Sequence, residues 1–172
     1  MEIAMKKLPV LLLALLPAVV PAHAQHAHSH GAGQLGIVVE GAQLTLLLEL
    51  PQQDVVGFER APKSAREQVT VQAALEKLKA PAKLFAPTAA AQCELSEHKI
   101  DAPLLEGTKG DHGHGDVEAR YVYRCTRPEA LNDLKSMVSA EFPRVRSLSV
   151  SFAGPKGQKA GKVDAKNPTF AW

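Results

Sequence analysis

Two neighbouring stretches of alternating hydrophobic residues constrain the fold of this chain more than any other feature. Leu35, Ile37 and Val39 occupy every second position in the first stretch, residues 34–40. Leucines occupy every second position from 44 to 50 in the second stretch. A period of two is typical of half-buried strands. The glycine-containing segment Glu40-Gly41-Ala42 lies between them, so the sequence predicts a β-hairpin.

Further along the chain, strand patterns are interrupted by two helical patterns. A helix is predicted to begin at Ser64, with Glu67 completing a capping box, and to end before Pro81. A second helix is predicted after Pro128, from the spacing of Leu131, Leu134, Met137 and Val138. The other predicted strands are 82–85, 90–98, 117–126, 145–153 and 159–165. This order predicts an α+β fold with a largely antiparallel sheet and two helices.

The N-terminus has the pattern of a secretory signal. Two lysines precede an apolar run from Leu8 to Val20, and Ala22-His23-Ala24 follows as a cleavage pattern. The apolar run is shorter than the roughly 20 residues that span a bilayer. We therefore expect residues 1–24 to be a signal peptide. Residues 25–172 are expected to form a single exported domain that does not insert into the membrane after cleavage.

The charge and the cysteine content narrow the possible class of protein further. The net charge is +2, and acidic and basic residues are mixed along the chain, so there is no nucleic-acid-binding pattern. The chain has two cysteines, Cys93 and Cys125, without the spacing of a redox or zinc motif. In an oxidising compartment this pair predicts a structural disulfide. A redox pair and metal thiolates are the alternatives.

Five of the seven histidines lie in two short clusters. His26, His28 and His30 are in a leader, residues 25–33, and His112 and His114 are in a loop, residues 99–116. Imidazole is a common zinc ligand, and alternate positions of an extended chain lie on one side. Weaker candidate ligands are His98, Asp111 and Asp116. The alternative is that both clusters are solvated polar segments that bind metal only incidentally.

Sequence motifs of common enzymes are absent. The chain contains no HExxH, no GxSxG and no P-loop. A catalytic zinc also needs ligands held by rigid elements with supporting neighbours. Short histidine clusters outside the strands suit metal capture, buffering or transfer better, so we expect a binding protein and not an enzyme.

The order of several short motifs resembles the ZrgA-like family of bacterial periplasmic zinc-binding proteins. These motifs are His28-Ser29-His30-Gly31, the strand ending in Leu50-Pro51, residues 57–62, the cysteine pair and Glu141-Phe142-Pro143. The resemblance covers about residues 27–172. It implies a periplasmic protein that binds zinc through a histidine-rich segment and assists a zinc importer.

Two departures from the family pattern stand out. The usual Gly-Phe-Glu-His is Gly-Phe-Glu-Arg here, and Arg60 cannot ligate zinc. The histidine-rich insertion is also short, with only two imidazoles. The leading hypothesis is zinc acquisition or buffering in the periplasm. Alternatives are an envelope protein with a structural or protein-interaction role and incidental histidines, or a copper or nickel carrier.

Overall fold

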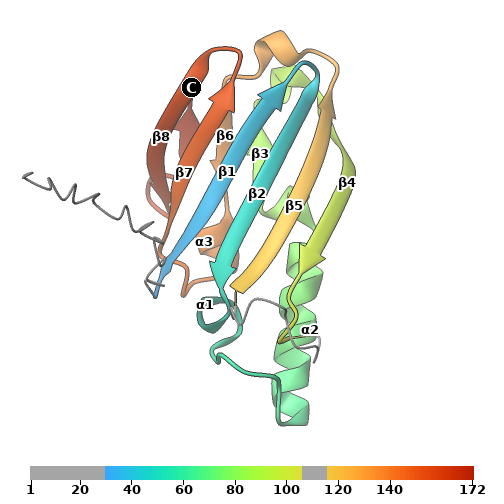
Figure 1. Ribbon diagram of the computed structural model, residues 1–172, viewed down its shortest axis with the longest axis vertical. Coiled ribbons are helices and arrows are strands. Elements are labelled where there is room, and N and C mark those ends of the chain that lie inside the picture. Colours follow the sequence, from blue (N-terminus) through green and yellow to red (C-terminus); the bar gives the residue numbers. More distant parts are fainter. Residues whose placement is uncertain (1–29, 106–115) are drawn as a thin grey trace, which may run out of the picture.

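Two β-sheets form the framework of the protein (Figure 1). The computed structural model describes residues 30–105 and 116–172, and all structural statements below refer to these residues. The larger sheet has six strands in the order β4-β5-β2-β1-β7-β8, and the smaller has the order β3-β6-β9. The bounds of the strands are β1 Ala32–Glu40, β2 Gln43–Pro51, β3 Phe85–Pro87, β4 Cys93–Asp101, β5 Asp116–Cys125, β6 Asp133–Ser136, β7 Ser147–Gly154, β8 Gly157–Asp164 and β9 Thr169–Ala171.

The helices are short except for one. They are α1 Gln52–Val56, α2 Ala65–Leu78 and α3 Val138–Glu141, with 3₁₀ turns η1 Pro81–Lys83, η2 Ala89–Ala91 and η3 Pro128–Ala130. Helix α2 begins as predicted, because the Ser64 hydroxyl accepts a hydrogen bond from the Glu67 amide. Its buried face consists of Val71, Ala74, Leu75 and Leu78, at the predicted helical spacing.

The hydrophobic core lies between the sheets and under α2. The predicted hairpin is confirmed: β1 and β2 are antiparallel, and their alternating leucines, isoleucine and valine are buried. Phe85 of the small sheet packs against Tyr121 of β5, with ring centroids 5.6 Å apart. The Tyr121 hydroxyl donates to the Leu78 carbonyl at 2.9 Å and so ties β5 to the end of α2. At the other side of the core, Trp172 stacks on Phe152 of β7.

The predicted α+β class is wrong, because the described residues are mostly β, with nine strands in two sheets. The main error is the second predicted helix. Leu131, Leu134 and Val138 are all buried, but Leu131 only caps the end of η3, whereas Leu134 lies in β6 and Val138 in α3. Strand β6 pairs with β3 and β9 on its two sides. These neighbours satisfy the backbone hydrogen bonds of β6, which outweighs the local helical spacing.

The sheet also contains a pairing that the hairpin pattern does not predict. Strand β1 is parallel to β7, with Leu35 opposite Val150, whereas the other strand pairs are antiparallel. The predicted disulfide is confirmed: Cys93 and Cys125 are directly opposite each other and join the edge strand β4 to β5.

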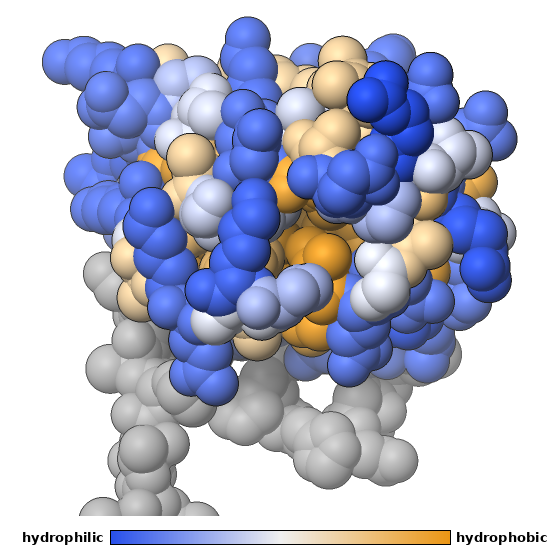
Figure 2. All heavy atoms as spheres, turned by 90° about the horizontal axis from the view of Figure 1, so that it is seen from above, coloured by the Kyte–Doolittle hydropathy of each residue, from blue (hydrophilic) through white to orange (hydrophobic). Residues whose placement is uncertain are grey.

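The end of the molecule that carries the β1–β2 and β7–β8 hairpins is viewed in Figure 2. Most of its visible surface is hydrophilic, with hydrophobic side chains showing between the charged ones. A hollow of about 220 Å³ at this end is lined by residues that include Val39, Leu131 and Trp172. The predicted histidine segments join the sheet at the opposite end.

Candidate metal-binding end of the sheet

The leader joins the large sheet at a clamped glycine. Gly31 has a φ of +82°, which is the left-handed region that favours glycine. Its amide donates to the buried carboxylate of Asp54 in α1 at 2.6 Å. Its carbonyl accepts from the amides of Arg146 and Ser147, at 2.9 and 3.2 Å. Both polar groups of this buried peptide are thereby satisfied, and the leader enters β1 at a fixed point.

His30 lies immediately outside this clamp. Its carbonyl accepts a hydrogen bond from the Arg146 guanidinium at 2.9 Å. Its imidazole Nδ1 lies 3.9 Å from a carboxylate oxygen of Glu59, and the His30 side chain is 66% exposed. The imidazole is therefore accessible to a metal ion, with a carboxylate beside it. Of the predicted leader ligands, His26 and His28 lie outside the described residues.

Glu59 reaches His30 because a buried glutamine holds its loop. The Gln52 side-chain amide is only 2% exposed and donates to the carbonyls of Phe58 and Arg60, at 3.0 and 2.8 Å. Gly57, with a φ of +93°, allows the chain to turn at the end of α1. The segment Gly57-Phe58-Glu59-Arg60 is thus a built turn next to the leader. Residues 57–62 were among the motifs that resemble the ZrgA-like family, but the sequence did not indicate that Glu59 lies beside His30.

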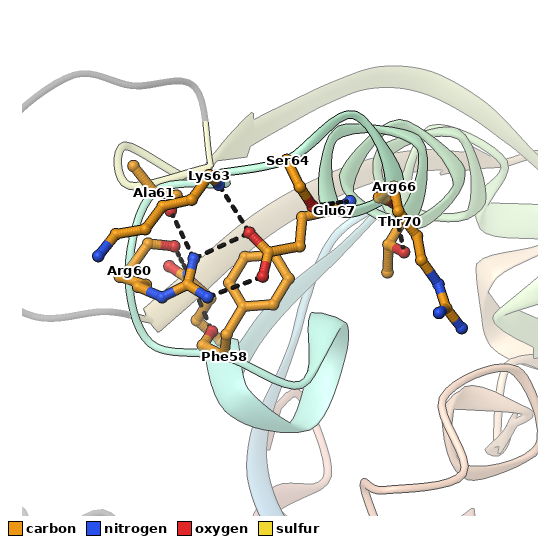
Figure 3. Close-up of polar contacts among 9 residues, drawn as sticks. Phe58, Arg60, Ala61, Lys63, Ser64, Arg66, Glu67 and Thr70 are labelled. Atoms are coloured by element: carbon orange, nitrogen blue, oxygen red, sulfur yellow. Dashed lines mark hydrogen bonds and ion pairs between the residues drawn. The ribbon is translucent and has the colours of Figure 1, made fainter.

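Arg60 has a structural role in this turn (Figure 3). Its guanidinium makes two hydrogen bonds to the carboxylate of Glu67 in α2, at 2.7 and 2.9 Å. It also lies over the Phe58 ring, 5.2 Å from the centroid. The Lys63 amide donates to the same carboxylate at 2.6 Å. These bonds fasten the turn to the first turn of α2.

The Arg60–Glu67 pair changes the acidity of both groups. The hydrogen bond from Arg60 and that from the Lys63 amide lower the pKa of Glu67 to about 2. The same hydrogen bond raises the pKa of Arg60. Glu67 therefore keeps its charge under mildly acidic conditions. The sequence predicted Glu67 as a capping residue, and the structure adds its bidentate contact with Arg60.

The second histidine segment joins the sheet close to the first. Asp116 is the first residue of β5 and pairs with Pro51, the last residue of β2. Strand β1 is the neighbour of β2 on its other side and begins at Ala32 at this same end of the sheet (Figure 1). A single strand therefore separates the two points of attachment. Asp111, His112 and His114 lie outside the described residues.

His98 lies away from both points of attachment. It lies on β4 opposite Tyr121, which is five positions along β5 from Asp116. Strands β5 and β2 lie between β4 and β1, so His98 is about 14 Å to the side of β1 at the usual strand spacing.

Within 30–105 and 116–172, no three His, Cys, Asp or Glu side chains are grouped so that they could hold a metal ion. None of the helices in these ranges is long and apolar enough to cross a membrane.

These features define a two-sheet β protein with a cross-strand disulfide, and with an accessible histidine at one end of its large sheet. Residues 27–172 match the ZrgA family, whose members are described as zinc uptake proteins, and the chain belongs to this family. Family membership indicates a role in zinc uptake. A comparison with curated proteins finds no match to this chain.

Proposed function

We propose that this protein is exported to the periplasm after removal of residues 1–24, and that it captures zinc there for acquisition or buffering. The zinc ligands we propose are the histidines of the two clusters, His26, His28, His30, His112 and His114. Zinc uptake is the described role of the family, which supports zinc as the ion. Neutral imidazoles are suitable ligands for zinc at neutral pH.

The observation that carries the proposal is the attachment of both segments at one end of the large sheet. Ala32 and Asp116 begin the two strands that flank β2. Two strand spacings separate these flanking strands, about 10 Å. His30 is two positions from Ala32, and His114 is two positions from Asp116. Each residue of an extended chain covers about 3.3–3.6 Å, so this separation is within reach of both clusters. We therefore propose that they share one zinc ion.

The neighbourhood of His30 supports its place among the ligands. Metal-bound imidazoles usually donate their second ring N–H to a carboxylate or a carbonyl, which fixes the ring orientation. Glu59, 3.9 Å from Nδ1, is placed to accept such a bond after a small side-chain rotation. The proposed zinc ligand atom of His30 is then Nε2. Asp111 and Asp116 remain proposed oxygen ligands of lower rank.

The proposed role is binding and transfer, without catalysis. The natural recipient of captured zinc is a component of a zinc importer, and this is the protein partner that we propose. Such a role requires that the metal be released as well as bound. Protons compete with zinc for imidazole nitrogens, whose ordinary pKa is about 6.5, so zinc binding is expected to weaken as pH falls below 7.

The proposal is tested by calorimetric zinc titration of residues 25–172. We compare the wild type with His26/His28/His30→Ala and with His112/His114→Ala. If the ion is shared, each variant loses affinity and neither retains a second independent zinc site. His98→Ala is the matched control, since it removes an exposed histidine far from both attachment points. Unchanged affinity in both cluster variants would exclude the proposed ligands.

Two further measurements separate the competing hypotheses. Titration with copper(II) or nickel(II) in competition with zinc tests for a copper or nickel carrier, because imidazole ligands intrinsically favour copper(II). Growth of a deletion strain on zinc-depleted medium tests the role in acquisition. Normal growth, together with no more zinc bound by the wild type than by a variant with all five cluster histidines replaced by alanine, would favour a structural or protein-interaction role in the envelope.

A further inference from the structure

The outer face of the six-stranded sheet carries a groove that the proposed zinc site does not use. The small sheet lies behind the large one and α2 lies at its lower end, so no described element covers this face (Figure 1). The groove has a volume of about 570 Å³, which is within the usual range of ligand sites. Its floor includes Leu47, which is 46% exposed although its β2 neighbours Leu46 and Leu48 are buried.

Small residues in adjacent strands create the hollow. Gly36 of β1 lies opposite Leu47, and Ser149 and Ser151 of β7 form the far wall. Gly36 is extended, with no positive φ, so this glycine is not required by the backbone. A Cβ at Gly36 would lie 3.4 Å from the Leu47 Cβ. A larger residue at 36 would therefore fit the strand while filling the groove.

One side of the groove is a row of carboxylates on three neighbouring strands. Asp101 of β4 is directly opposite Glu118 of β5, and Glu118 is directly opposite Glu49 of β2. All three line the groove. Like charges at directly paired positions are unfavourable in a sheet. A partner that brings positive charge to this row would relieve that repulsion.

One of the two cations in the groove is directed away from Asp101 and Glu118. Lys99 and Arg120 are opposite each other, two positions along their strands from Asp101 and Glu118. The Arg120 guanidinium pairs with Glu97 at 3.3 Å, and Glu97 is not among the groove residues. The lining therefore combines an exposed leucine with an excess of negative charge.

We propose that this groove docks a basic segment of a partner protein, with alternating apolar and Lys or Arg side chains. In an extended segment, one set of side chains would rest on Leu47 and Gly36. The lysines or arginines would bind Asp101 and Glu118 by charge-assisted hydrogen bonds. Charge complementarity at such a surface accelerates association and selects against acidic partners. The proposal does not depend on the zinc proposal, because it uses none of the zinc ligands.

The test uses a capped five-residue peptide of alternating lysine and leucine and ¹⁵N-labelled residues 25–172. Peptide addition is expected to shift the amide signals of Gly36, Leu47 and Glu118. The combined variant Asp101→Asn/Glu118→Gln is expected to weaken the peptide Kd at least about tenfold, because two charge-assisted hydrogen bonds are lost. Gly36→Val, which fills the hollow and retains the charges, is expected to weaken binding by a similar factor.

A charge-matched control separates docking from general attraction to an acidic surface. Glu40→Gln/Glu94→Gln removes two exposed carboxylates of β1 and β4 that lie outside the groove, and it should leave the Kd unchanged. A glutamate–leucine peptide should not bind. Equal weakening in the control, equal binding of the acidic peptide, or signal shifts elsewhere would overturn the proposal. It would also be overturned if zinc shifted the Asp101 and Glu118 signals in the variant with all five cluster histidines replaced by alanine, which would make the row itself a metal site.

Discussion

The clamp at Gly31 allows a sharp prediction, because the protein offers a matched control for it. Replacement of Gly31 by alanine imposes two costs. A non-glycine residue in the left-handed region costs about 1–2 kcal/mol. The new Cβ would also overlap the Arg146 guanidinium. Displacement of that side chain breaks its hydrogen bond to the His30 carbonyl, which costs about 1–2 kcal/mol at this exposed site.

Gly41→Ala measures the first cost by itself. Gly41 also has a positive φ, +57°, but a Cβ there would meet nothing within 4 Å. We therefore expect Gly31→Ala to lower the free energy of unfolding by about 2–4 kcal/mol, and Gly41→Ala by about 1–2 kcal/mol. Urea unfolding of residues 25–172 followed by circular dichroism measures both values. Equal destabilisation by the two substitutions would refute the contact between residue 31 and Arg146.

Three other predictions concern stability. Glu67 has a lowered pKa of about 2, so its contribution to folding stability is fully present above its unfolded pKa, about 4.3, and is lost as pH falls towards 2. The difference in melting temperature between wild type and Glu67→Gln should therefore shrink over that pH interval. A constant difference would contradict this prediction. Tyr121→Phe should cost about 1 kcal/mol more in chemical unfolding than Tyr123→Phe. The Tyr121 hydroxyl is hydrogen-bonded, whereas the buried Tyr123 hydroxyl has no hydrogen-bond partner among the described residues; equal costs would argue against this difference. Joint replacement of Cys93 and Cys125 by alanine should lower the unfolding free energy by about 3–4 kcal/mol for a separation of 32, and a loss below about 1 kcal/mol would show that the crosslink adds little.

The sequence predicts the local elements well where one face of an element is buried. The β1–β2 hairpin follows from strict alternation, and α2 follows from its capping serine and its apolar stripe. The same reasoning fails between Pro128 and Phe142. Leu131, Leu134 and Val138 are buried as expected, but strand pairing with β3 and β9 decides the element type of β6. Partners distant in the sequence supply that information, so local spacing cannot contain it.

The candidate site likewise combines features that the sequence predicts with contacts between distant residues that it does not predict. Spacing identifies His30 and Asp116 as residues of interest, and the motif around Phe58 marks the turn that carries Glu59. The clamp on Gly31 involves Asp54 and Arg146, which are 23 and 115 positions away. The attachment of both histidine segments beside β2 depends on strand order, which the hairpin pattern alone does not define.

The central claim is that the two histidine clusters together hold zinc. Its most direct measurement is the zinc content of residues 25–172 after equilibrium dialysis against a buffered zinc concentration at pH 7.5. We predict one zinc ion per chain in the wild type and in His98→Ala. We predict no retained zinc once His26, His28, His30, His112 and His114 are all alanine. One zinc ion per chain in that five-residue variant would contradict the account.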